Sequence, residues 1–275
     1  MRLGGPLFET YADPHTWILD LKNMGYRAAY CPEITSGYTS EDFAHAAREA
    51  DIVIAEVGVW NNPLSPDEAT RQKAIHVCQK KLALADEIGA ACCVNIAGSR
   101  GEKWDGPHPD DLTPETFDMI VETVRKIIDA VQPGRTFYTL ETMPWMYPDS
   151  VENYLRLVSA INRPAFSVHF DPVNMISSPQ KYYKNGLLIE EFITVLGSRI
   201  KSVHVKDIIL RDHLTTHLDE VRPGKGKLDY PGLLKGLNRL HPDLPIMVEH
   251  LPDEAEYNMA VAYIRNVATD IGISV

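Results

Sequence analysis

The stretch AFSVHFDPVN, residues 165–174, decides the fold prediction. Its polar residues Ser167, His169 and Asp171 alternate with apolar ones, which is the period of two of a β-strand with one apolar face. Strands this apolar usually lie in a sheet that helices cover. Pro172 ends the strand directly after Asp171, so the stretch predicts a buried strand with a carboxylate at its carboxyl end.

Three other predicted strands also end in ionisable side chains. They span residues 136–143 (TFYTLETM), 200–207 (IKSVHVKD) and 245–251 (PIMVEHL). Alternate positions place Glu141, His204 and Glu249 near their carboxyl ends. In a closed parallel barrel these ends surround one mouth, so we expect the three side chains to meet Asp171 there.

The rest of the chain alternates predicted strands with predicted helices. The other strands cover residues 2–8, 26–32, 52–60 and 92–98. The helices cover residues 13–24, 40–50, 67–88, 113–131, 149–161 and 180–196, a short stretch around 233–237, and a last segment from 253. This pattern predicts a single-domain α/β fold, a (β/α)8 TIM barrel over residues 1–275, with an open doubly wound sheet as the alternative.

Two long connections interrupt the alternation. Residues 99–112 (SRGEKWDGPHPDDL) are too rich in glycine, proline and charge for a regular element, and we interpret them as a candidate lid. Residues 208–227 form a second long loop, which ends in RPGKGK. Turn geometry explains its glycines, although the ending also weakly resembles a phosphate-binding loop.

Charge and composition narrow the expected partners. The net charge of −11 over 275 residues argues against nucleic acid and anionic membranes. The sequence has no leader pattern and no run of about 20 apolar residues, which favours a cytoplasmic enzyme. The cysteines lack a CxxC spacing and are interpreted as buried thiols; they are Cys31, Cys78, Cys92 and Cys93.

Two glutamates, an aspartate and a histidine form a ligand set that suits a divalent cation. Oxygen ligands with one imidazole and no thiolate favour Mn2+ or Mg2+, and also allow Co2+ or Zn2+. Each residue alone would more often cap a helix or pair with a lysine. Their shared position at one edge of the sheet favours a single metal site, made of Glu141, Asp171, His204 and Glu249.

The chain also resembles the xylose-isomerase-like TIM barrels, a family of sugar phosphate isomerases and epimerases. The resemblance covers nearly the whole chain and rests on LET (140–142), FDPVN (170–174), HVKD (204–207), PGKGKLDY (223–230) and VEH (248–250). It implies that the same four residues hold one divalent metal ion. It also implies that Glu141 and Glu249 are catalytic and act as a proton-transfer pair.

The sequence departs from the family pattern at two places. Asn174 stands where many members have a histidine, and it can hydrogen-bond a hydroxyl group but cannot titrate. Glu220 stands where ketose 3-epimerases have an arginine, and Arg222 lies nearby. These two positions leave the identity of the sugar open.

Six residues are candidates for binding substrate at the mouth: Asn95, His108, Trp145, Asn174, Lys206 and Arg222. Lys206 shares the face of His204 and could bind a substrate oxygen or form a structural ion pair. Asn95 ends a strand and Trp145 could stack on a sugar, but satisfied core amides and packed tryptophans are as common. His108 could act as an acid if the lid closes, whereas an exposed loop histidine is the simpler interpretation.

Three further polar residues are expected to support the mouth. His169 lies one layer below Asp171 and should hydrogen-bond a ligand. Glu56 interrupts an apolar strand and is interpreted as a core group that its neighbours satisfy. Asp207 faces away from His204 and should anchor the following loop.

The leading functional hypothesis is a metal-dependent isomerase or epimerase of carbohydrate metabolism that acts on a ketose or keto-sugar through an enediolate. The alternative is a lyase that eliminates a β-substituent from a 3-keto glycoside or inosose, including C-glycoside deglycosidase-like activity. A nuclease related to the AP endonucleases of this fold and an inactive subunit are further options. The expected partner is a small sugar, with a homo-oligomer through the outer helices as an option.

Overall fold

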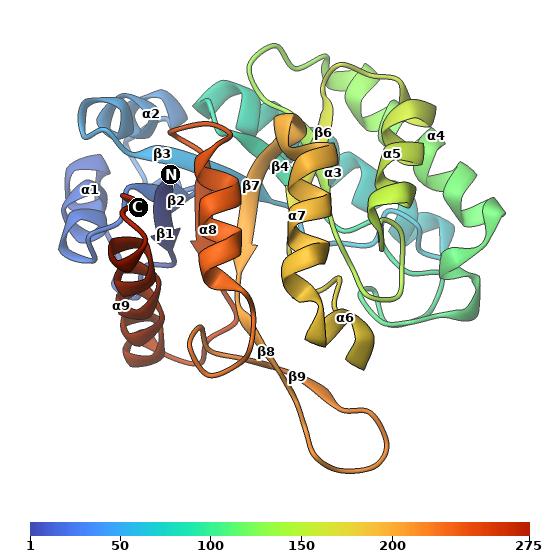
Figure 1. The fold of residues 1–275 in the computed structure, drawn as a ribbon. Helices are drawn as coiled ribbons and strands as arrows, with labels where there is room; N and C mark the ends of the chain where they lie inside the picture. The colour runs from blue at the N-terminus through green and yellow to red at the C-terminus, as the bar shows by residue number, and fades with distance from the viewer.

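Parallel strands close into a barrel in the computed structural model, which describes residues 1–275 (Figure 1). The barrel strands are β1 (Arg2–Gly5), β2 (Ala28–Tyr30), β3 (Val53–Gly58), β4 (Cys92–Asn95), β5 (Tyr138–Glu141), β6 (Phe166–Phe170), β7 (Ile200–Val205) and β10 (Pro245–Val248). Around the barrel they follow the order β1-β10-β7-β6-β5-β4-β3-β2. The predicted (β/α)8 barrel is confirmed.

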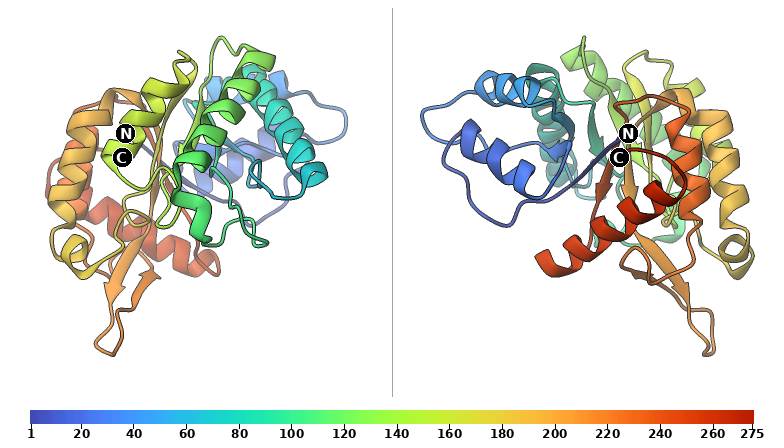
Figure 2. Two further views of the ribbon diagram at one scale, coloured as in Figure 1. Left: turned by 90° about the vertical axis from the view of Figure 1, so that its right-hand side faces the viewer. Right: turned by 60° about the vertical axis from the view of Figure 1, so that its left-hand side comes forward.

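Helices follow the strands and form the outer layer of the barrel (Figure 2). They are α1 (Pro14–Asn23), α2 (Ser40–Glu49), α3 (Glu68–Ile88), α4 (Pro114–Val131), α5 (Val151–Ile161), α6 (Pro179–Tyr183), α7 (Asn185–Leu196), α8 (Tyr230–Asn238) and α9 (Glu254–Asp270). Short 3-10 turns occupy Pro109–Leu112 and Gly197–Arg199. None of the helices combines the length and the apolar character that crossing a bilayer requires.

Short polar side chains fix where several helices begin. Asp13 accepts a hydrogen bond from the Thr16 amide at the start of α1, and Ser150 and Asp253 cap α5 and α9 in the same way. Each cap satisfies a free N–H group of the first turn and stabilises the helix by about 1 kcal/mol. The predicted starts of these helices therefore agree closely with the structure.

Two segments differ from their predicted structure. The single helix predicted over 180–196 is divided into α6 and α7, because Lys184 leaves the helical conformation. The loop predicted over 208–227 contains an antiparallel pair, β8 (Asp207–Leu210) and β9 (Leu218–Val221), which projects from the barrel (Figure 1). Its seven-residue tip (RDHLTTH) has no Asn-Gly or Asp-Gly turn signal, so the sequence did not reveal the hairpin.

The apolar core lies mainly between the barrel and its helices. Strand residues such as Val168 and Val203 belong to one cluster of 63 buried residues together with helix residues such as Phe192. The inward positions near the mouth are polar instead, because Glu56, His204 and their partners occupy them. The four cysteines carry free thiols, and three of them are buried.

Candidate metal centre

Four side chains of metal-ligand type meet at the carboxyl end of the barrel. Glu141 is the last residue of β5, Asp171 follows β6, His204 lies near the end of β7, and Glu249 follows β10. One ligand atom from each lies within 4.8 Å of the others, and all four residues are buried. The structure thus brings together the four residues that alternation along the strands had placed on one edge.

His204 is at the centre of this cluster. Its Nδ1 atom lies 2.8 Å from Glu249 Oε2 and 3.1 Å from Glu141 Oε1. Burial opposes a charge on the ring, but the carboxylates of Glu249, Glu56 and Glu141 raise the pKa of His204 well above its usual value. The ring therefore takes up a proton where the carboxylates converge.

Glu56, in β3, holds the other side of the His204 ring. Its Oε1 atom lies 2.9 Å from His204 Nε2. Its Oε2 atom accepts a hydrogen bond from Ser202 Oγ at 2.9 Å and lies 3.1 Å from His169 Nε2. Burial favours the neutral acid, yet the two histidines lower the pKa of Glu56 below its ordinary value. His169 therefore contacts Glu56, and not one of the four candidate ligands as predicted, and it reaches His204 through Glu56.

Lys206 lies among the carboxylates and is 1% exposed. Its Nζ atom is 2.8 Å from Asp171 Oδ2, 2.7 Å from Glu249 Oε1 and 3.3 Å from Glu220 Oε2. Burial would lower the pKa of Lys206, but Asp171 and Glu249 raise it well above the usual value. Burial would raise the pKa of Glu249, but the positive charges of His204 and Lys206 hold it well below its usual value.

Asp171 is held by the backbone that follows β6. Its Oδ1 atom accepts hydrogen bonds from the amides of Val173 at 2.8 Å and Asn174 at 3.1 Å. Burial raises the pKa of Asp171 to about 7, although the Lys206 ammonium acts in the opposite direction. Among the three carboxylates of the cluster, Asp171 is therefore the one that takes up a proton most readily near neutral pH.

The charges and free atoms of the cluster fit a divalent cation. Asp171 Oδ2 and Glu249 Oε1 are buried and receive no well-aligned hydrogen bond, even though Lys206 is close to both. The three carboxylates carry three negative charges, which a dication and Lys206 would balance if His204 were neutral. Oxygen ligands with one imidazole are also the donors that Mn2+ and Mg2+ accept. The residues present therefore suit one such ion.

A cavity of about 520 Å³ opens at the cluster. Of the predicted substrate residues, Trp145, Asn174 and Lys206 line it. Asn174 Nδ2 donates a hydrogen bond to Glu141 Oε1 at 3.2 Å. The aromatic residues of the lining are Tyr30, Trp60, Trp104, Trp145 and Tyr257. Such a surface, with a few polar groups at its base, is typical of a small-molecule site.

The candidate lid is part of the cavity wall. Residues 103–105 line the cavity. Asp111 is fully buried and accepts hydrogen bonds from the amides of Arg100 at 2.7 Å and His108 at 2.8 Å. Asp111 thus fastens both ends of the segment, and its movement as a lid stays a prediction.

Asn95 faces away from the mouth, contrary to its predicted position beside a substrate. Its amide donates a hydrogen bond to Asn61 Oδ1 at 3.0 Å and lies 3.7 Å from Cys78 Sγ on α3. The next residue, Ile96, lines the cavity instead. Because side chains alternate along a strand, a difference of one residue exchanges the two faces. Asn95 is a satisfied core amide.

His108 and Arg222 also lie outside the cavity. His108 caps the 3-10 turn, where its ring accepts a hydrogen bond from the Asp110 amide at 3.3 Å. Arg222 Nε donates to Glu256 Oε2 of α9 at 2.8 Å. Both residues come from irregular segments, in which the sequence gives no periodicity to orient a side chain. The geometry gives them structural contacts in place of the predicted substrate contacts.

Asp207 organises the loop that ends in RPGKGK. Its carboxylate accepts hydrogen bonds from the amides of Gly224 and Gly226 at 3.0 Å each and of Leu228 at 2.9 Å. The predicted anchoring role of Asp207 is therefore confirmed. The amides that a phosphate would need are already used, so the weak resemblance to a phosphate-binding loop has no structural support.

His250, in the cavity wall, had no predicted role in the site. His250 Nδ1 lies 3.2 Å from Glu220 Oε2 and 3.4 Å from Lys206 Nζ. The backbone of His250 has a left-handed φ of 57°, which is unfavourable for a residue other than glycine and is typical of functional positions. The sequence feature that could have indicated a role for His250 is its position directly after Glu249.

Comparisons with known proteins agree with the fold of the barrel. The family model described as xylose isomerase-like TIM barrel matches residues 15–267. No curated protein sequence matches the chain.

Solved structures share the fold at low sequence identity. L-ribulose 3-epimerase is 12% identical, with a TM-score of 0.70 over 98% of this chain and 93% of that chain. The probable 3-DHS dehydratase AsbF from Bacillus anthracis is 14% identical, with a TM-score of 0.69 over 97% and 98%. A xylose isomerase-like TIM barrel protein from Mycobacterium smegmatis in complex with magnesium is 15% identical, with a TM-score of 0.65 over 94% and 90%.

Proposed function

Because the chain belongs to the xylose isomerase-like TIM barrel family, we propose that it is a divalent-metal-dependent sugar isomerase or epimerase. Its substrate is a ketose or keto-sugar, and its reaction moves a proton at the carbon next to the carbonyl group. The observation that carries the proposal is the contact of two carboxylates, Glu141 and Glu249, with the same atom of His204.

The metal ligands in this proposal are Glu141, Asp171, His204 and Glu249. When bound, the ion would draw electron density from the sugar carbonyl and a neighbouring hydroxyl group, and so make the adjacent C–H bond more acidic. The oxygen-rich ligand set favours Mn2+, with Mg2+ as the next choice.

In this proposal, Glu141 and Glu249 remove and return the substrate proton next to the carbonyl group. They approach from β5 and β10, which β6 and β7 separate in the barrel, so they reach a substrate from different sides. Burial favours their neutral forms, but His204 lowers the pKa of both, so each is ionised and able to accept a proton at neutral pH. Removal of a proton by one carboxylate and its return from the side of the other would invert the carbon.

Three residues of the cavity orient the sugar. Lys206 and Asn174 offer N–H donors next to the carboxylates, and Trp145 supplies an aromatic face at the wall. The Trp145 indole N–H donates to the carbonyl of Asp105 at 2.9 Å, which fixes the ring. A substrate held this way presents its carbonyl end to the ligands.

The test is proton exchange in deuterated water. The protein is stripped with a chelator, reloaded with Mn2+, and incubated with a panel of ketoses and 3-keto sugars, while NMR follows loss of the C–H signal next to the carbonyl. We expect exchange that needs the ion and about one ion bound per chain. Exchange with none of the compounds would refute the proposal, and three tightly bound zinc ions per chain would favour a nuclease.

A lyase is the second candidate. The same first step would expel a β-substituent from a 3-keto glycoside or inosose, and Glu220 lies at the mouth where it could serve the leaving group. The fold of the probable dehydratase AsbF is similar as well. Release of a leaving group in the exchange experiment, in place of an epimer, would favour this reaction.

A further inference from the structure

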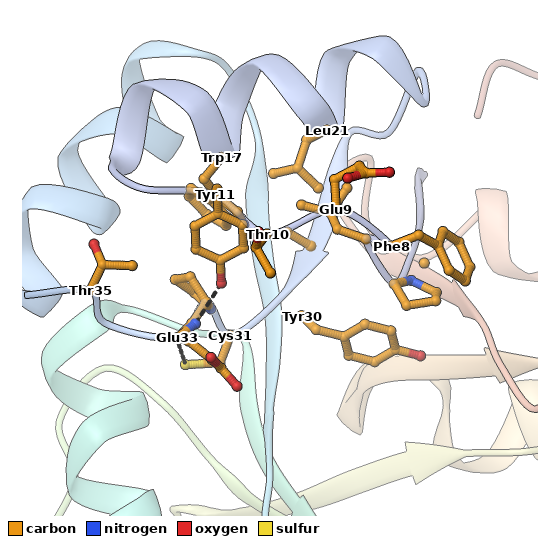
Figure 3. A pocket seen from close by; sticks show the side chains of 15 residues that line it. Phe8, Glu9, Thr10, Tyr11, Trp17, Leu21, Tyr30, Cys31, Glu33 and Thr35 are labelled. Atoms are coloured by element: carbon orange, nitrogen blue, oxygen red, sulfur yellow. Dashed lines mark hydrogen bonds between the residues drawn. The ribbon is translucent and has the colours of Figure 1, made fainter. Parts of the chain in front are cut away.

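A second hollow of about 360 Å³ lies beside the metal cavity, between the loops that follow β1 and β2. Figure 3 shows the two loops on opposite sides of it, with the Tyr11 ring reaching from one toward the other. The residues that give it its chemical character are Phe8, Glu9, Tyr11, Tyr30, Cys31 and Glu33. None of the ligands of the metal centre lines this hollow.

Tyr30 lies between the two cavities. It lines both of them, and its hydroxyl group donates to the carbonyl of Val248 at 3.3 Å, one residue before the ligand Glu249. Phe8, which is 41% exposed, packs against Tyr257 of the metal cavity with 5.4 Å between ring centroids. The second hollow therefore begins next to the metal centre, and aromatic side chains form the boundary.

A hydrogen bond and packed aromatic rings hold one side of the second hollow together. The Tyr11 hydroxyl accepts a hydrogen bond from the Glu33 amide at 2.6 Å, which ties the two loops together (Figure 3). The Tyr11 ring packs on Trp17 and Phe43, with centroids 6.4 and 6.0 Å away. The hollow is thus largely formed before any ligand arrives, which reduces the entropy that binding must cost.

Its chemistry suits a ring that carries hydroxyl groups. Glu9 and Glu33 are exposed and form no ion pair, so their carboxylates are free to accept hydrogen bonds. Phe8, Tyr11 and Tyr30 add aromatic surface beside them. Aromatic faces with hydrogen-bond acceptors at the edge match the apolar C–H faces and outward hydroxyl groups of a sugar.

We propose that this hollow binds a second sugar ring, attached to the ring that the metal centre activates. The substrate would then be a keto derivative of a disaccharide or a similar glycoside, and a free ketose would fill only the metal cavity. This inference rests on the proposed function, because it assumes that the metal cavity holds a keto-sugar.

The test compares 3-keto-trehalose with 3-keto-glucose on the manganese-loaded enzyme, with proton exchange as the readout. We expect kcat/KM to be at least about tenfold higher for the disaccharide, and Thr10→Trp to remove that advantage by filling the hollow. The control is Ser36→Trp, which adds the same bulk at an exposed position outside the lining. Calorimetry with trehalose and glucose gives a second readout that needs no turnover.

The outcomes separate the two proposals. If both compounds exchange equally and Thr10→Trp behaves like Ser36→Trp, the second hollow is not a sugar site, although the proposed function stands. If neither compound exchanges, and no ketose of the earlier panel does, but trehalose binds and Thr10→Trp prevents it, the hollow is a sugar site and the proposed reaction is wrong. Glu9→Gln and Glu33→Gln should each weaken trehalose binding about threefold to tenfold if their carboxylates accept its hydroxyl groups.

Discussion

His204 Nε2 lies 2.9 Å from Glu56 Oε1, on the side of the ring away from Glu249 and Glu141. A histidine that binds a metal usually donates its other N–H group to such a carboxylate, which fixes both the tautomer and the orientation of the ring. Glu56 thus directs Nδ1 of His204 to the ligand cluster. Ser202 and His169 in turn fix Glu56 itself.

Glu56→Gln should weaken metal binding without unfolding the barrel. The amide keeps the shape of the side chain but loses the charge that stabilises an N–H on His204 Nε2, so we expect about 10- to 100-fold lower Mn2+ affinity. Competition with a fluorescent chelator measures the affinity, and circular dichroism checks the fold. Ser202→Ala removes one hydrogen bond to Glu56 and should have a smaller effect. Unchanged affinity in Glu56→Gln would show that the contact is only packing.

Glu249→Gln should abolish proton exchange in a folded protein. The amide cannot take up a proton, and loss of a positioned general base typically costs about 100- to 10,000-fold in rate. The same result is expected for Glu141→Gln. The control is Glu256→Gln, which removes a carboxylate that pairs with Arg222 outside the cavity. Activity near the wild-type level in either ligand variant would remove the proposed role of that residue.

The convergence of the four candidate ligands was predictable because a strand gives its side chains a period of two. Once the ends of four strands were located, the alternation of side chains between the two faces predicted a shared edge of the barrel. The residues placed there were Glu141, Asp171, His204 and Glu249. The same argument explains the error at Asn95. The strand was placed correctly along the sequence. However, the side chain of Ile96 points to the cavity, and that of Asn95 points to the opposite face of the strand.

Features that depend on irregular segments could not be predicted in this way. His108 and Arg222 come from loops, where contacts with Asp110 and Glu256 decide the direction of the side chain. The partnership of Glu56 with His204 is a contact across the barrel between β3 and β7, and the sequence contains no local sign of it. The second hollow likewise depends on how two loops pack together.

Metal affinity should fall as the pH drops below about 7. Burial raises the pKa of Asp171 to about 7, so at lower pH this ligand carries a proton that the ion must displace. One such proton lowers the affinity by about tenfold for each pH unit, and a protonated His204 adds to the effect. Titration of Mn2+ from pH 5.5 to 8 measures the slope. A flat profile below pH 7 would contradict the assignment of Asp171 as a ligand.

The same raised pKa predicts how stability depends on pH in the presence of a chelator. Because Asp171 binds its proton more tightly in the folded state, its contribution to stability is present below the unfolded pKa of 3.8 and is lost as the pH rises through about 7. Asp171→Asn removes this loss. The variant also loses the contact with Lys206, which is a fixed cost. The difference in unfolding free energy between variant and wild type should therefore shift in favour of the variant as the pH rises from 5 to 8 in urea unfolding, and a constant difference would contradict the shift.

Lys206→Met should destabilise the protein mainly when a chelator is present. The substitution leaves Asp171 and Glu249 buried without their ammonium partner, and breaking a buried ion pair typically costs about 3–5 kcal/mol. Excess Mn2+ should restore most of that loss, because the dication supplies positive charge to the same carboxylates. Urea unfolding with EDTA and with Mn2+ measures both values. Lys201→Met is the control, since Lys201 lies over the Phe137 ring at 4.2 Å and away from the ligands. An equal loss for Lys206→Met in both conditions would mean that Lys206 and the ion do not share the carboxylates.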